Sequence, residues 1–255
     1  MRKKITPVNK LYEFADLSII KEDAPGAENF FYPSSYKELT GFINVKTITT
    51  PLLYQPLDDT HNKILKRCFD IILSIIIIIG ILSWLMPIIA LAIWIDSRGP
   101  IFFLQKRNKR GEELFTCIKF RSMVVNADAD ILPAGRNDKR ITAIGTFLRN
   151  HYIDELPQFF NVLMGDMSII GPRPHMVSDN IKYEKEIDHY NYRHKGKPGI
   201  TGLAQVLGYV GTATNVQEIK DRVGLDIFYL RHWSLRLDII ILYRTFCKII
   251  NLPLR

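Results

Sequence analysis

Residues 71–95 read IILSIIIIIGILSWLMPIIALAIWI, a run of twenty-five residues without a charged side chain. About 20 apolar residues are enough for a helix to cross the hydrocarbon core of a bilayer. A buried helix of a soluble protein is the alternative, but the length of the run and its density of isoleucine favour insertion into a membrane. This stretch decides the fold, because it predicts a membrane-embedded chain.

Pro87 and the flanking charges bear on how this run enters the membrane. Pro87 cannot donate a hydrogen bond to the carbonyl of Ser83, and its ring crowds that turn. The positive-inside rule places basic flanks in the cytoplasm, and a straight span satisfies only one of two basic flanks. A re-entrant helix-break-helix hairpin over 61–98, broken near Pro87, satisfies both. The basic residues are Lys63, Lys66 and Arg67 before the run, and Arg98, Lys106, Arg107, Lys109 and Arg110 after it.

The remaining sequence predicts an α+β, mainly helical protein. Residues 1–60 contain no repeat or chemical motif and are interpreted as an accessory or loosely ordered segment. IFFLQ and LFTCIKF indicate two short strands around a turn at Arg110-Gly111. The stretch 233–252 predicts an amphipathic helix, which either packs on the domain core or lies on acidic headgroups. Asp70 follows Lys66 and Arg67, so a local ion pair at headgroup level is its expected role.

Composition narrows the classes of partner. The formal charge of +8 and a pI near 9.3 indicate an anionic partner, namely nucleic acid, acidic lipid or a phosphorylated substrate. Cys68, Cys117 and Cys247 lie far apart, which argues against a disulfide framework or structural zinc and suits a reducing compartment. The first residues are basic but lack an apolar h-region, so no cleavable signal peptide is expected.

Asp154 and Glu155 are the candidate chemical groups. Pro157 is tolerated only in the first turn of a helix, so a helix is expected to start near Ile153 or Asp154. Carboxylates at a positive helix end are stabilised there, and a phosphate or a cation-bridged phosphate can dock beside them. The local pattern by itself equally describes an N-cap aspartate followed by a first-turn acid.

Four basic residues surround this pair in the sequence. Arg149 lies in the preceding helical turns, and Lys119 and Arg121 alternate with Phe120 and so share one face of a strand. Arg173 lies between Pro172 and Pro174, which limit its backbone freedom. Arginine forks match phosphate oxygens, and a preorganised one loses less entropy on binding. Together they suggest a diphosphate site, although singly each is more often a surface charge.

Sequence blocks in a fixed order complete the pattern. They are KRCFDIIL (66–73), GPIFFLQKRNKRGEELFTCIKFRSM (99–123), RITAIGTFLRNHYIDELPQFFNVLMGDMSIIGPRPH (140–175), KPGITGLAQV (197–206) and FYLRHWSLRLDI (228–239). Over about 64–250 the chain resembles the bacterial sugar transferases, monotopic polyprenyl-phosphate phosphoglycosyl transferases. The resemblance implies a cytoplasmic catalytic domain over 99–255 on the bacterial inner membrane, with interfacial amphipathic helices.

The resemblance also implies a reaction. Asp154 would attack the β-phosphate of a UDP-sugar, release UMP and hold a covalent phosphosugar, which polyprenyl phosphate then accepts. Glu155, with Asp154, would hold Mg²⁺. Lys119, Arg121, Arg149 and Arg173 would contact phosphate or nucleotide. Membrane lipid is a further partner, and a homo-oligomer and contacts with downstream glycosyltransferases are compatible with the resemblance.

The chain departs from the family pattern in two places. Relatives often have Ser-Pro at the helix break where this chain has Met86-Pro87, and QVNGYRGE where it has QVLGYVGT at 205–212. The second difference leaves the sugar open between glucose, galactose and N-acetylated hexoses. A simple hexose, glucose or galactose, is favoured because the long C-terminal region resembles that branch of the family. An inactive membrane scaffold is an alternative, which the intact acid pair argues against. A nucleic-acid-binding protein leaves the apolar run unexplained, so nucleic acid is not an expected partner.

Overall fold

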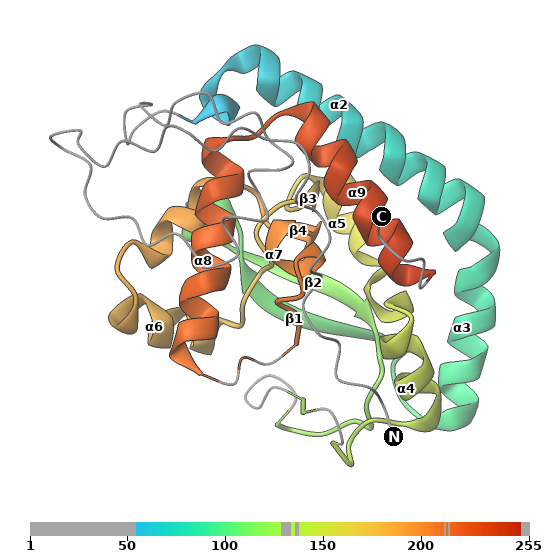
Figure 1. Ribbon diagram of the computed structural model, residues 1–255. Coiled ribbons are helices and arrows are strands. Elements are labelled where there is room, and N and C mark those ends of the chain that lie inside the picture. The colour runs from blue at the N-terminus through green and yellow to red at the C-terminus, as the bar shows by residue number, and fades with distance from the viewer. Residues whose placement is uncertain (1–54, 129–133, 136–137, 212, 214, 251–255) are drawn as a thin grey trace, which may run out of the picture. The chain divides into compact units, whose positions relative to one another are not determined.

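The computed structural model describes residues 55–128, 134–135, 138–211, 213 and 215–250. The N-terminal segment predicted over 1–60 therefore lies mostly outside the described residues. Residues Gln55–Arg255 form one compact unit. Its α-helices are α2 (Thr60–Ile77), α3 (Ser83–Asp96), α4 (Ala143–Asn150), α5 (Gln158–Met164), α6 (Val177–Glu186), α7 (Leu203–Val206), α8 (Val216–Arg231) and α9 (Leu235–Ile249). The protein is thus mainly helical, as predicted (Figure 1).

Two small sheets lie among these helices. Strand β1 (Phe102–Asn108) pairs antiparallel with β2 (Leu114–Phe120), with Phe102 opposite Phe120. The turn between them contains Gly111 at φ 74°, a left-handed conformation that suits glycine. This confirms the hairpin predicted around Arg110-Gly111. Strand β3 (Ser168–Ile170) pairs in parallel with β4 (Gly199–Thr201).

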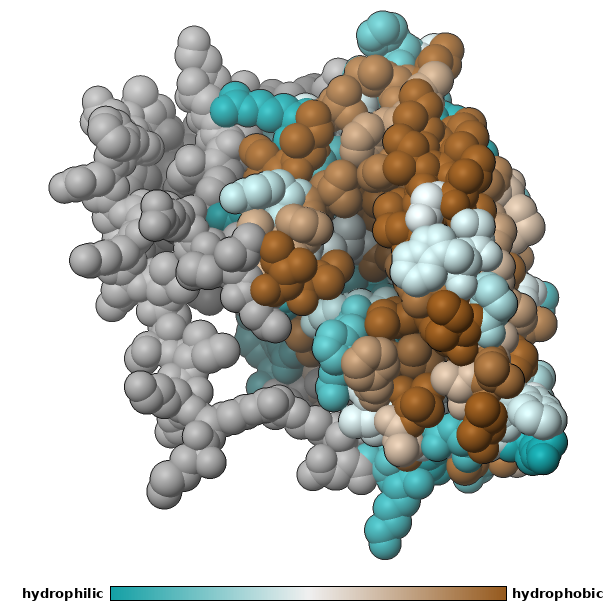
Figure 2. All heavy atoms as spheres, turned by 90° about the vertical axis from the view of Figure 1, so that its right-hand side faces the viewer, coloured by the Kyte–Doolittle hydropathy of each residue, from teal (hydrophilic) through white to brown (hydrophobic). Residues whose placement is uncertain are grey.

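The apolar run forms most of one long helix. Within the described residues, Thr60–Asp96 is the helix long and apolar enough to cross a membrane by length and composition, with a mean hydropathy of 2.7 in its most apolar window. Figure 2 looks onto the side of the molecule along which α2 and α3 run in Figure 1, and hydrophobic side chains cover much of that face. Its exposed apolar residues include Ile72, Ile76, Ile79, Trp84, Ile88, Leu91 and Ile95. Little of this helix is covered by the rest of the chain.

The predicted break near Pro87 is wrong in position. Pro87 lies inside α3, and the irregular stretch is a π-helical segment, Ile78–Leu82, between α2 and α3. The buried residues of α2, namely Lys66, Asp70 and Ser74, are four positions apart. Because an α-helix has 3.6 residues per turn, residues at this spacing shift gradually around the helix and do not stay on one line. A π turn takes up an extra residue, which counteracts this drift and fits with the full burial of Leu82. The helix axis turns between α2 and α3 (Figure 1).

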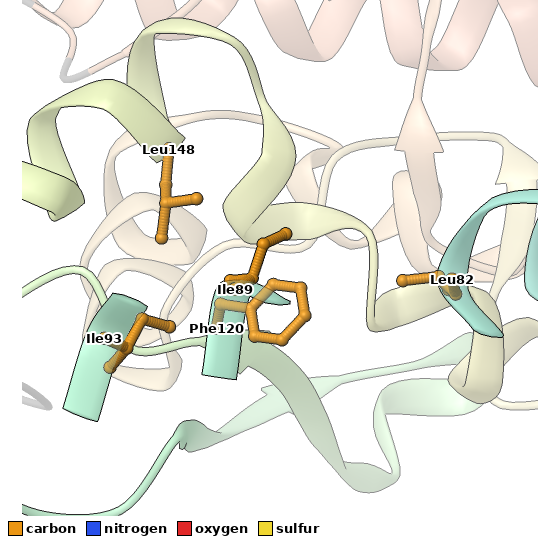
Figure 3. Close-up of a cluster of buried hydrophobic side chains, with 5 residues drawn as sticks. All are labelled: Leu82, Ile89, Ile93, Phe120 and Leu148. Atoms are coloured by element: carbon orange, nitrogen blue, oxygen red, sulfur yellow. The ribbon is translucent and has the colours of Figure 1, made fainter. Parts of the chain in front are cut away.

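A hydrophobic cluster attaches α3 to the rest of the unit. Leu82, Ile89 and Ile93 pack with Phe120 from the end of β2 and Leu148 from α4 (Figure 3). All five are at most 6% exposed, and burial of each such side chain contributes about 1.5–3 kcal/mol. The inner face of the apolar helix is therefore part of the domain core, while its outer face is open.

Asp70 corrects another expectation. The expected local ion pair with Lys66 is present, but Asp70 is buried, 2% exposed, and does not lie at the surface. Its Oδ1 accepts hydrogen bonds from Ser168 Oγ and the Ile169 amide, both at 3.0 Å, and lies 3.8 Å from Lys66 Nζ. A buried carboxylate needs such partners to offset its lost hydration. Asp70 therefore fixes α2 to β3.

The C-terminal helix α9 also has two distinct faces. It buries Leu237, Asp238, Ile241 and Cys247, which confirms packing on the domain core. A second row of apolar residues at helical spacing stays exposed, namely Ile239, Tyr243, Phe246 and Ile250. This row leaves the other expectation, contact with a membrane interface, as a proposal.

Candidate active site

The acid pair lies in a turn between α4 and α5. Tyr152 adopts a left-handed conformation at φ 58° and separates α4 from a single 3₁₀ turn, Ile153–Glu155. The α-helix that follows starts at Gln158, with Pro157 as its N-cap. A helical turn therefore starts at Ile153 as expected, but it is a single 3₁₀ turn, so the positive end of a long helix does not explain the site. Side-chain charges must do so instead.

Asn161 places this turn against the β1–β2 hairpin. It is fully buried on α5, where its Oδ1 accepts from the Ile118 amide at 2.9 Å and its Nδ2 donates to the Thr116 carbonyl at 2.8 Å. One side-chain amide thus satisfies a donor and an acceptor of β2, as a neighbouring strand would. The turn before α5 is thereby held beside Lys119 of β2. Asn161 was not among the predicted site residues, since an asparagine inside a helix carries no local signal for this pairing.

Glu155 is the centre of a charge cluster. Its Oε1 lies 3.0 Å from Lys119 Nζ and 2.5 Å from one Arg173 guanidinium nitrogen, and its Oε2 lies 3.1 Å from the other. This is a bidentate arginine–carboxylate pair with a lysine added. Glu155 is only 7% exposed, whereas the Arg173 side chain is 38% exposed and reaches the surface. The structure thus brings together three of the predicted site residues.

Two glycine-rich segments hold the backbone of Arg173. A Cβ on Gly171 would lie 2.4 Å from the Lys197 carbonyl, and one on Gly199 would lie 2.1 Å from the Gly171 amide. The Gly199 amide donates to the Pro172 carbonyl at 2.9 Å. The GPRP and KPGITG segments therefore pack backbone to backbone, at a distance that only glycine allows. The KPGITG segment thus fixes the backbone from which Arg173 reaches Glu155.

The buried Arg193 also holds the backbone of the segment that carries Arg173. Arg193 donates to the Arg173 carbonyl at 2.5 Å and pairs with Asp226 at 2.8 Å. Both side chains are almost fully buried, and Tyr190 also accepts from Arg193, at 3.2 Å. Neither Arg193 nor Asp226 was predicted as a site residue. Their partners are far away in the sequence, so no local pattern indicates them.

The two carboxylates have opposite shifts in pKa. Burial alone would raise the pKa of Glu155, but the charges and hydrogen bonds of Arg173 and Lys119 outweigh burial and hold it well below its usual range. Burial raises the pKa of Asp154, and the negative charge of Glu155 raises it further, against the opposing charges of Lys119, Arg149 and Arg173. Neighbouring acids with separated pKa values are typical of a site where the two play different roles.

Asp154 is the less constrained of the two acids. It is half-buried, and among the residues that the structure describes no hydrogen bond reaches its carboxylate. Glu155, by contrast, receives three. A carboxylate free of fixed donors retains its nucleophilicity and can approach a substrate atom. The geometry therefore distinguishes an available acid from one that is held in place.

The two remaining predicted residues lie differently. Arg149 is close enough to Asp154 to lower its pKa. Arg121 is buried and donates to the carbonyls of Ser97 and Arg98 after α3, at 2.5 and 2.9 Å. Strand β2 ends at Phe120, so the alternation that was expected to place Arg121 beside Lys119 stops there. Arg121 thus fixes the end of the apolar helix in this structure.

Asp154 and Glu155 are the residues of this site that could hold Mg²⁺. Asp154 and Glu155 are adjacent, but the described residues contain no group of three or more side chains that could hold a metal ion. Mg²⁺ in phosphate-transferring sites is often held by one or two carboxylates together with substrate phosphates and water. The pair fits Mg²⁺ in that way, with Asp154 as the carboxylate not already engaged by cations.

Comparison with known proteins identifies the family. The model of the bacterial sugar transferase family matches residues 61–252, which include the apolar helix, both sheets and the whole charge cluster. The chain belongs to the bacterial sugar transferase family, and this confirms the resemblance seen in its sequence blocks.

Individual relatives agree with this assignment. A UDP-glucose:undecaprenyl-phosphate glucose-1-phosphate transferase of Klebsiella pneumoniae is 44% identical over 199 residues, 78% of this chain and 42% of that protein. Its namesake in Xanthomonas campestris pv. campestris is 46% identical over 196 residues, 76% of this chain and 40% of that protein. A third, in Caulobacter vibrioides, is 39% identical over 191 residues, 74% of this chain and 71% of that protein. The chain therefore spans less than half the length of the first two.

Proposed function

We propose that this chain transfers a sugar-1-phosphate from a UDP-sugar to polyprenyl phosphate, with release of UMP. The observation that carries the proposal is the arrangement of Asp154 beside the Lys119–Glu155–Arg173 cluster. It combines an available carboxylate with fixed positive charge, as phosphoryl transfer requires. The names of three relatives favour UDP-glucose as the sugar donor. Undecaprenyl phosphate is the acceptor that those names give.

The first step uses the freer acid. An Asp154 carboxylate oxygen attacks the β-phosphorus of the UDP-sugar, and the bond from that phosphorus to the bridging oxygen breaks. UMP leaves with the bridging oxygen, and the sugar phosphate stays on Asp154 as an acyl phosphate. Arg173 is half-exposed and can turn its outer edge toward the diphosphate while it still pairs with Glu155. Lys119 adds a second positive charge, and Arg149 adds a third.

The second step regenerates the enzyme. A phosphate oxygen of polyprenyl phosphate attacks the same phosphorus, and the bond to Asp154 breaks to release its carboxylate. Glu155 stays ionised throughout, because its cationic partners depress its pKa. Asp154 and Glu155 would hold Mg²⁺, which would supply positive charge to the phosphate oxygens of the substrate. We propose this metal as a cofactor of the reaction.

Both substrates must reach one site, and insertion of the apolar helix would place this site at the membrane surface, where the lipid substrate lies. We propose that Thr60–Asp96 enters the bacterial inner membrane and leaves on the same, cytoplasmic, side, with its turn at the π segment. The exposed outer face and the axis turn between α2 and α3 support this arrangement. The exposed row on α9 would then lie at the interface as an amphipathic helix. A homo-oligomer and contacts with downstream glycosyltransferases stay predictions.

The chemistry is tested with Asp154→Asn and, as a matched control, Asp188→Asn at an exposed aspartate. The purified full chain is incubated with UDP-glucose and Mg²⁺, with and without undecaprenyl phosphate, and UMP is measured. We expect Asp154→Asn to release only background UMP and Asp188→Asn to match wild type. Without acceptor, the wild-type peptide that contains Asp154 should gain the mass of a hexose phosphate. Wild-type UMP release by Asp154→Asn would refute the assignment of the nucleophile.

Topology is tested by placing tags at both termini in spheroplasts. Re-entry predicts that both tags stay protected from an external protease and become accessible only after the membrane is opened. One tag accessible from outside would show a complete crossing of the membrane, and it would leave the assignment of Asp154 untouched. A parallel screen of UDP-galactose and N-acetylated UDP-sugars identifies the donor.

A further inference from the structure

A cavity lies beside the start of the apolar helix. It has a volume of about 330 Å³, and its walls come from the start of α2, from β3, from the end of α8 and from residues 195–197. None of the four residues Lys119, Asp154, Glu155 and Arg173 lines it. The cavity is therefore separate from the candidate active site.

Positive charge dominates this cavity. Six basic side chains line it against a single acid, Asp70, which is buried and already bound to β3. The six are Lys63, Lys66, Arg67, Arg110, Lys195 and Lys197. Lys66 is paired with Asp238, which does not line the cavity. Asp70 is the carboxylate among the lining residues. Such a concentration of one charge in a concave site attracts anions.

Several of these cations are held in place. Arg67 donates to the carbonyls of Val162 and Leu163 at 2.5 and 2.7 Å, so its guanidinium is fixed at the end of α5. Arg110 pairs with Asp58 at 3.5 Å, but both side chains are about half exposed, so this pair is weak. The cavity thus presents preorganised charge and not only flexible surface lysines.

Lys197 differs from the other five cations in its surroundings. It is half-buried, and its ammonium forms no hydrogen bond or ion pair with the residues that the structure describes. Its Nζ lies 3.7 Å from the point where a Cβ on Gly165 would stand, and Arg67 Nη2 lies 3.8 Å from the same point. Burial lowers the pKa of Lys197, and the nearby charge of Arg67 lowers it further. The charges of Asp70 and Asp166 oppose this effect only in part, and an anion between Lys197 and Arg67 would stabilise both cations further.

We propose that this cavity is a binding site for a phosphate group, supplied either by a lipid headgroup or by free phosphate. Lys197, Arg67 and Lys63 would contact the phosphate oxygens, and Leu57 and Leu230 would face the uncharged part of the ligand. The site lies where α2 begins its apolar run, which is the level at which headgroups meet the helix. The proposal does not depend on the reaction assigned to Asp154.

Acetylation of Lys197 provides a site-specific test. The full chain is treated briefly with acetic anhydride, with and without sodium phosphate at constant ionic strength, and each lysine is quantified by peptide mass spectrometry. Phosphate at about ten times its dissociation constant should slow the reaction of Lys197 about ten-fold. Exposed Lys185 on α6 is the internal control and should react at an unchanged rate. An unchanged rate at Lys197 with both phosphate and lipid would overturn the proposal.

Bilayers of known lipid composition identify the source of the phosphate. The same reaction is run on the chain in phosphate-free detergent micelles and in bilayers of phosphatidylcholine with and without phosphatidylglycerol. Protection by either bilayer relative to the micelles assigns the site to a lipid headgroup, and protection only by sodium phosphate assigns it to free phosphate. The double variant Lys63→Met/Lys195→Met removes two charges from the cavity lining and should lose most of the protection, while its thermal unfolding stays close to that of wild type. Full protection in that variant would also count against the site.

Discussion

Lys66 on α2 and Asp238 on α9 form a buried ion pair with 2.7 Å between Nζ and Oδ2, across 172 residues of sequence. Asp238 has no exposed surface and also accepts from Tyr229 Oη at 2.8 Å and from Trp233 Nε1 at 3.0 Å. Three donors from α2, α8 and the α8–α9 connection thus converge on one carboxylate. This network attaches the apolar helix to the domain that carries Asp154.

Replacing Asp238 should therefore be strongly destabilising. Asp238→Ala removes the nearer partner of the buried Lys66 ammonium and leaves it with Asp70 at 3.8 Å. It also leaves the Tyr229 and Trp233 donors without their acceptor, and these losses together cost about 3 kcal/mol. Urea unfolding of the detergent-solubilised chain measures this loss. The exposed Asp188→Ala is the control and should stay within about 0.5 kcal/mol of wild type. An equally small effect for Asp238→Ala would show that the pair does not hold α2 in place.

Arg173→Lys tests the proposed contact of Arg173, the bidentate partner of Glu155, with the substrate. Lysine keeps the charge but cannot pair through two parallel hydrogen bonds. We expect kcat/KM for UMP release to fall about 10²-fold, the usual loss when one preorganised donor is removed from a transition state. Exposed Arg236→Lys is the matched substitution and should have wild-type activity. Unchanged kinetics for Arg173→Lys would show that a point charge suffices there.

The dependence of activity on pH should report Asp154. Only its ionised form can attack phosphorus, so activity is lost as the pH falls through the pKa of Asp154, which burial and then Glu155 raise above 3.8. Lys119 lowers this pKa, so Lys119→Met should move the acid limb of the kcat/KM profile to higher pH. Lys185→Met should leave the limb in place. A limb that moves to lower pH in Lys119→Met would contradict the assignment.

Gly199→Ala tests the contact between the two glycine-rich segments. The added methyl group would meet the Gly171 amide at 2.1 Å, so the segment that carries Arg173 must shift. We expect a loss of about 1–3 kcal/mol in stability together with a loss of activity. Gly135→Ala is the control, because nothing lies within 4 Å of its added Cβ. Wild-type behaviour of Gly199→Ala would show that the two backbones can separate without cost.

Some features of this protein were determined by the sequence alone. A run of twenty-five uncharged residues predicts a long apolar helix in any tertiary context, and the structure contains it. The β1–β2 hairpin likewise follows from two apolar stretches and a glycine that accepts positive φ. The acid pair and Arg173 became candidates from the prolines beside them, and the resemblance of their sequence blocks to a known family assigned their roles. Each of these signals depends on residues close together in the chain.

The tertiary structure decided which of these residues meet. Lys119 and Arg121 look equivalent in the sequence, yet β2 ends between them, so one pairs with Glu155 and the other with the carbonyls after α3. Asp70 looks like a surface acid but is buried against β3. Propensity and periodicity act over a few residues, whereas the partner of a charge depends on which distant segments pack around it. The helix and the acid pair are therefore local properties of this sequence, and the candidate active site is a property of its packing.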